Sequence, residues 1–70
     1  MSLKKRSFTL SGHRTSVALE AEFWAVIEQS AKSRGKSLAA LVAAIDAGRG
    51  ERPLASALRL HALAAKGGEA

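Results

Sequence analysis

The sequence predicts a mostly α-helical fold in which one N-terminal β-strand precedes two core helices and a third, C-terminal helix. Side chains suited to a protein interior alternate with side chains suited to the surface in residues 13–19. Later segments repeat apolar residues at helical spacing, and glycines separate these segments. A period of two is typical of a half-buried strand, and spacings of three and four residues indicate amphipathic helices. We expect a domain at residues 13–65, between a basic N-terminal arm at 1–12 and a flexible tail at 66–70.

The strand prediction depends on the alternation within His-Arg-Thr-Ser-Val-Ala-Leu at 13–19. The inward face consists of Thr15, Val17 and Leu19. The opposite face consists of Arg14, Ser16 and Ala18. A lone strand leaves backbone N–H and C=O groups unpaired, and no other segment is a convincing partner, so we expect antiparallel pairing with a copy from a second subunit. Residues 1–12 are either a flexible arm or a short extra strand through Phe8 and Leu10.

Three helices are expected after the strand. The first spans 20–33 and stops before Gly35, since glycine suits the position just beyond a helix C-terminus. The second spans about 38–47 and begins after Ser37, whose hydroxyl can cap the first turn. The third spans about 54–65. It carries leucines on two nearly opposite sides, so it needs two packing surfaces.

A homodimer is the expected source of stability for this chain. It has 70 residues and no cysteine, and domains of this size usually need a disulfide, a metal or a partner chain. The two histidines, His13 and His61, lie far apart in the sequence and do not form a metal-ligand cluster. The residues assigned to the dimer core are Val17, Leu19, Phe23, Trp24, Ile27, Leu38, Leu41, Val42 and Ile45.

The net charge of +5 and the isoelectric point near 10.5 favour nucleic acid, an anionic membrane surface or an acidic partner. Membrane binding is disfavoured because the basic residues do not line the polar face of one strongly amphipathic helix. The sequence has no apolar run long enough to span a bilayer and no secretory leader, so we expect a cytoplasmic protein. It also lacks paired carboxylates and a nucleophile–base pair. We therefore expect no enzymatic activity, cofactor, metal or small-molecule substrate.

The sequence resembles the ribbon-helix-helix superfamily, the Arc and MetJ repressor type, and in particular a bacterial subfamily of small predicted DNA-binding proteins. Ser11-Gly-His-Arg-Thr-Ser-Val17 is the most distinctive segment. Glu22-Phe-Trp24 and Ser37-Leu-Ala-Ala-Leu-Val42 extend the resemblance, which covers roughly residues 4–65. It implies that a ribbon made of one strand from each subunit enters the major groove of double-stranded DNA, a mode open to β-ribbon proteins.

The resemblance implies that the outward strand residues Arg14, Ser16 and Ala18 contact bases. An arginine fork matches the O6 and N7 acceptors of guanine, whereas an alanine offers only apolar contact, for example with a thymine methyl group. It also implies that Lys36 and Ser37 bind a phosphate at a helix N-terminus. From their charge, Lys4, Lys5 and Arg6 are assigned to phosphates. Ala21 departs from the proline expected at the start of the first helix.

The function expected from these features is that of a homodimeric, sequence-specific DNA-binding protein that regulates transcription, with two dimers side by side on some sites. One alternative is an antitoxin that neutralises a toxin, which would have to use the third helix because residues 66–70 leave little tail. Another is a protein-interaction dimer that does not bind DNA. This second alternative rests on Ala18, which leaves two polar residues per subunit on the reading face.

Overall fold

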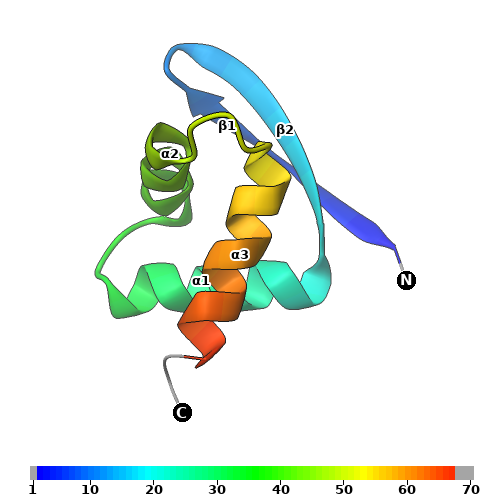
Figure 1. Ribbon diagram of the computed structural model, residues 1–70, viewed down its shortest axis with the longest axis vertical. Coiled ribbons are helices and arrows are strands. Elements are labelled where there is room, and N and C mark those ends of the chain that lie inside the picture. The colour runs from blue at the N-terminus through cyan, green and yellow to red at the C-terminus, as the bar shows by residue number, and fades with distance from the viewer. Residues whose placement is uncertain (1, 68–70) are drawn as a thin grey trace.

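The computed structural model describes residues 2–67, which form a β-hairpin followed by three helices. The elements are β1 (Leu3–Leu10), β2 (His13–Glu20), α1 (Ala21–Ser33), α2 (Leu38–Gly48) and α3 (Leu54–Gly67). Figure 1 shows the hairpin arching over the helices, with α3 crossing α1 and α2 standing beside them. Among the helices, the most extensive packing is between α1 and α3.

The prediction that the strand has no partner within its own chain is wrong. β1 and β2 form a two-stranded antiparallel sheet, with a register that runs from Leu3 opposite Glu20 to Leu10 opposite His13. Of the two alternatives for residues 1–12, the structure therefore has the extra strand. Ser11 and Gly12 connect the strands, with φ of 52° and 80°. Positive φ at both central residues defines a type I′ turn, whose twist matches that of the flanking strands.

The predicted junction between the first two helices is confirmed. Gly35 has a φ of 67°, its N–H donates to the carbonyl of Lys32 at 3.0 Å, and the N–H of Lys36 donates to the carbonyl of Ala31 at 2.9 Å. This pair of bonds is a Schellman motif, which satisfies the last carbonyls of α1. The Ser37 hydroxyl accepts the N–H of Ala40 at 3.0 Å, as a helix N-cap does.

The third helix has the two-sided character that the sequence predicts. Leu54 and Leu58 are buried against the rest of the chain, whereas the side chains of Leu60 and Leu63 are 45% and 60% exposed. The helix continues to Gly67, beyond the predicted end at 65. The remaining residues of the predicted tail, 68–70, lie outside the described part of the chain.

The residues assigned to a dimer core pack within a single chain. Six of the nine are buried, namely Val17, Leu19, Trp24, Ile27, Leu41 and Val42. The other three, Phe23, Leu38 and Ile45, are half-buried against the same core. The hairpin completes this core within one chain, because β1 adds Phe8 and Leu10 and the two strands together cover apolar surface of the helices. These residues therefore form a core within one chain, and their part in a dimer stays a prediction.

Candidate nucleic-acid interface

On the outer face of the hairpin, three cross-strand pairs of side chains lie between the turn and Ala18 and point away from the core. Their register is Lys5 opposite Ala18, Ser7 opposite Ser16, and Thr9 opposite Arg14. Five of the six are exposed and Ala18 is half-buried. The three residues predicted to contact bases therefore share one face, and β1 places Lys5, Ser7 and Thr9 beside them. The register continues this row to Leu3 opposite Glu20, at the end away from the turn. The face therefore carries the cations Lys5 and Arg14 and, at that far end, the Glu20 carboxylate, which is paired with Arg59.

The Ser7 and Ser16 hydroxyls are hydrogen-bonded to each other, with their oxygens 2.9 Å apart. A two-residue turn closes on a hydrogen-bonded pair of residues, here Leu10 and His13, so the outer-face pairs occupy the alternate positions, where opposing side chains approach more closely. In this geometry the backbone N–H and C=O groups of the β2 residues on the outer face point away from β1. They therefore lie along the free edge of β2.

The three basic residues of the N-terminal arm do not form one patch. Lys4 and Arg6 alternate with Lys5 and belong to the row of β1 on the helix side. The Arg6 guanidinium lies 5.1 Å from the centre of the Trp24 ring, and its Nη1 is 3.4 Å from Glu28 Oε2. Arg6 is thus engaged within the chain, and Lys5 is the member of this trio on the outer face.

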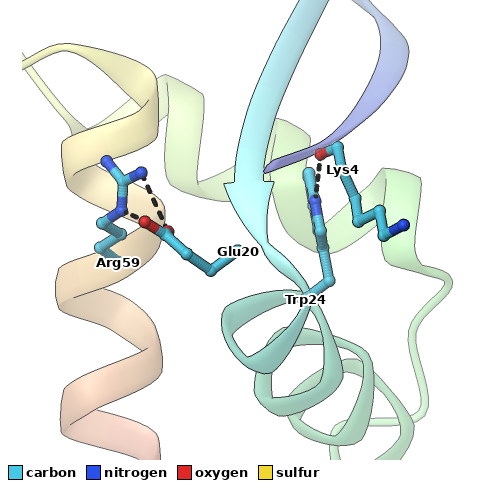
Figure 2. A network of polar contacts seen from close by, with 4 residues as sticks. All are labelled: Lys4, Glu20, Trp24 and Arg59. Atoms are coloured by element: carbon cyan, nitrogen blue, oxygen red, sulfur yellow. Dashed lines mark hydrogen bonds and ion pairs between the residues drawn. The ribbon is translucent and has the colours of Figure 1, made fainter. Parts of the chain in front are cut away.

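Trp24 fixes β1 to α1 at three successive inward positions. Its indole Nε1 donates a hydrogen bond to the backbone carbonyl of Lys4 at 2.7 Å, a contact visible in Figure 2. Arg6 lies over the ring, and the Phe8 ring packs against it with centroids 6.0 Å apart. Since Trp24 is only 1% exposed, β1 is held against a rigid, buried platform.

Lys36 and Ser37 lie at a different place from the outer face of the hairpin. Figure 1 shows that the connection between α1 and α2 is far from the hairpin turn. Lys36 is exposed and lines an open groove together with Lys32 from the end of α1 and with Glu28, whose carboxylate is paired with Arg6. The positive end of α2 lies here too, so this corner suits an anion. The structure therefore separates the predicted phosphate corner from the predicted base contacts.

An ion pair links the end of β2 to α3. Arg59 donates from Nε and Nη2 to Glu20 Oε1 at 3.2 and 3.0 Å, and its guanidinium carbon lies 5.7 Å from the centre of the Phe23 ring. Figure 2 shows the two side chains reaching toward each other across the strand end. The pKa of Glu20 is lowered. The main cause is a hydrogen bond from the backbone N–H of Glu20 itself, and the second is the hydrogen bonding from Arg59.

A second polar contact joins α1 to α3. Ser30, which is buried, shares a hydrogen bond of 2.9 Å with Nε2 of His61. Burial lowers the pKa of His61, and the nearby positive charge of Arg34 lowers it further. Within residues 2–67, no three potential metal ligands cluster together. In the same part of the chain, no helix has the length and apolar character needed to cross a bilayer.

A strand that leads directly into a helix, followed by a glycine turn and a second, serine-capped helix, defines the ribbon-helix-helix class. The family model described as the ribbon-helix-helix domain matches residues 3–65, and the chain belongs to this family. Proteins of this family generally bind DNA as dimeric transcription regulators and are typically not enzymes. Comparisons with curated proteins and with solved structures gave no match.

Ser7 and Thr9 also belong to the outer face, although they were not predicted from the sequence. Two signals point to them. The Ser11-Gly12 dipeptide is a common turn signal between strands, and Phe8 and Leu10 alternate with Ser7 and Thr9 immediately before it. Together they indicate a hairpin whose polar row on β1 continues the polar row on β2.

Proposed function

We propose that this protein is a homodimeric, sequence-specific DNA-binding regulator of transcription, and that the outer face of its hairpin faces the DNA. The observation that carries the proposal is the grouping of Arg14, Ser16 and Ala18 on that face. The one carboxylate in the same row, Glu20 at the far end, is already paired with Arg59. Arg14 supplies a fork for guanine, Ser16 donates to or accepts from a base edge, and Ala18 offers apolar contact to a thymine methyl group.

Dimerisation is proposed through the free edge of β2. Each strand of a two-stranded sheet has one unpaired edge, which is a template for pairing with another chain. Within residues 2–67, the backbone hydrogen bonds found outside regular elements involve neither strand. Antiparallel pairing of β2 with its copy then gives the order β1-β2-β2-β1, with the two β2 strands at the centre.

Phosphate contacts are proposed for Lys5 on the outer face and for Lys36 and Ser37 at the start of α2. Such contacts set affinity and salt dependence, while base contacts set sequence preference. Arg6 is assigned to the anchoring of β1 instead, because Trp24 and Glu28 already engage its guanidinium. Lys4 lies with Arg6 in the row of β1 on the helix side. Its exposed side chain is assigned only a minor electrostatic attraction to the DNA.

The experiment that tests the proposed function combines sizing with DNA selection. Light scattering at micromolar concentration is expected to give the mass of two chains. Selection from random duplexes is expected to enrich a short site with two-fold symmetry, and affinity for that site is expected to fall steeply as salt rises. A monomeric protein contradicts the dimer, and the absence of any enriched site contradicts sequence-specific binding.

A second candidate function, an antitoxin or another protein-interaction dimer, is favoured by the exposed side of α3. Leu60 and Leu63 lie on the side of the helix away from the core and are large apolar side chains in water. Surface of this kind suits a protein partner. Substitution of both leucines by lysine separates the two candidates. The variant is expected to lose binding to a protein partner such as a toxin, whereas DNA binding, which requires only the dimer, is expected to remain. Sizing of the same variant shows whether the dimer persists.

A further inference from the structure

We propose that the outer row of β1, formed by Lys5, Ser7 and Thr9, is a phosphate-binding row that flanks the base-reading strand β2. This inference rests on the proposed function and assigns a role to Ser7 and Thr9. It also separates the hairpin face into two parts, with bases contacted from β2 and the DNA backbone contacted from β1 of the same chain.

The width of the sheet relative to the groove decides which strand contacts which part of the DNA. Neighbouring strands lie about 4.8 Å apart, so the outermost strands of a four-stranded sheet are about 14 Å apart. The major groove is about 12 Å wide and admits a two-stranded ribbon. With the order β1-β2-β2-β1, the two central strands fit within the groove. The two β1 strands then lie over its walls, which are lined with phosphates.

The chemistry of the β1 row suits phosphate oxygens. Lys5 carries an ammonium group, and Ser7 and Thr9 carry hydroxyls that donate hydrogen bonds. All three are exposed. Hydroxyls and lysines are common partners of the DNA backbone. Lysine and hydroxyl groups can also contact base edges, so the position of β1 over the groove walls is what assigns this row to phosphates.

The hydrogen bond between Ser7 and Ser16 couples the two rows. When Ser16 donates its proton to the Ser7 oxygen at 2.9 Å, the Ser7 hydroxyl proton is left free to donate outward. The β1 backbone is already fixed, since the Trp24 indole bonds the Lys4 carbonyl and its ring holds Arg6 and Phe8. The phosphate-facing row is therefore pre-positioned, which reduces the entropy lost on binding.

The test compares three single variants with two matched controls in the selection and salt titration described above. The variants are Lys5→Ala, Ser7→Ala and Thr9→Val, and the last keeps the shape of the side chain. The controls are Lys66→Ala and Ser33→Ala, which remove the same groups from exposed positions at the ends of α3 and α1. Circular dichroism and light scattering on each variant confirm that fold and mass are unchanged.

Lys5→Ala is expected to reduce the magnitude of the slope of log affinity against log salt by about 0.9 per subunit, because each phosphate contact releases condensed counterions. Ser7→Ala and Thr9→Val are each expected to weaken binding roughly five- to 150-fold per dimer, because one hydrogen bond is lost from each subunit. Their salt slope is expected to remain unchanged, because they carry no charge. The enriched site is expected to stay the same for all three.

Two results overturn the inference while leaving the proposed function standing. If Thr9→Val, which touches no residue of the base-reading row through a hydrogen bond, changes the enriched site, then β1 reads bases. If all three variants bind with the affinity and salt slope of the controls, β1 does not contact the DNA. If the unmodified protein enriches no site, the proposed function fails first and the phosphate row fails with it.

Discussion

Trp24 in α1 donates its indole N–H to the carbonyl oxygen of Lys4, 20 residues earlier in the chain, at 2.7 Å. This bond joins the first strand to the first helix, and the same indole ring supports Arg6 and Phe8. Trp24 therefore fixes β1, and with it the β1 half of the outer face, against α1, in addition to the ladder with β2 and the burial of Phe8 and Leu10.

Trp24→Phe is expected to lower the free energy of unfolding by about 1–3 kcal/mol, because it removes a hydrogen bond, part of a cation–π contact and some buried volume. Trp24→Ala, which empties the site, is expected to cost about 3–5 kcal/mol. Urea unfolding measures both. A Trp24→Phe protein as stable as the original contradicts the role given to the indole N–H.

The hairpin turn offers a stabilising substitution. Ser11 has a φ of 52°, in the left-handed region that asparagine tolerates better than serine. Ser11→Asn creates the Asn-Gly pair preferred in type I′ turns, and we expect a gain of roughly 0.5 kcal/mol in the free energy of unfolding from the lower backbone strain. Gly12→Ala, at a φ of 80°, is expected to cost about 1 kcal/mol. Thermal unfolding that ranks the two variants in the opposite order contradicts the turn assignment.

The ion pair between Glu20 and Arg59 predicts a pH-dependent contribution to stability. The pKa of Glu20 is lowered in the folded protein, so its stabilising effect is fully present above the ordinary carboxyl pKa of 4.5 and is lost as the pH falls through the folded value. Glu20→Gln is therefore expected to melt below the unmodified protein at pH 7, with the difference shrinking toward pH 3. A difference that persists at pH 3 indicates that the carboxylate charge is not its cause.

His61 predicts a second pH effect, at higher pH. Its pKa is lowered from 6.5 by burial, so the folded protein favours the neutral ring and loses stability as the pH falls below 6.5. His61→Gln, which keeps a polar group near Ser30, is expected to remove the part of the melting-temperature decrease that occurs between pH 7 and 5. Nuclear magnetic resonance titration of the His61 ring measures the shift itself. A pKa at or above 6.5 contradicts this account.

The helices were predictable because their signals are local. Gly35 and Ser37 mark the junction between α1 and α2 through their own backbone and hydroxyl chemistry, and the structure has both the predicted turn and the predicted cap. The spacing of apolar residues placed each helix to within a few residues. The predicted strand at 13–19 likewise matches β2, except that β2 also includes Glu20.

The first strand was harder to predict because its inward row is half cationic. Lys4 and Arg6 occupy positions where the alternation requires apolar side chains. They are tolerated because the Trp24 ring accepts the guanidinium of Arg6, a long-range contact that no local pattern contains. Because β1 was not recognised as a strand, β2 was predicted to have no partner within its own chain. The outward direction of Arg14, Ser16 and Ala18 was predictable from β2 alone.

The central claim is that the outer face of the hairpin reads DNA sequence, and Arg14 tests it most directly. DNA selection with Arg14→Ala is compared with Arg52→Ala, which removes an arginine from the exposed loop between α2 and α3. Arg14→Ala is expected to relax one base position in each half-site, with a loss of about 1–3 kcal/mol for the preferred base, while Arg52→Ala leaves the site unchanged. An enriched site that is identical for both variants contradicts the claim.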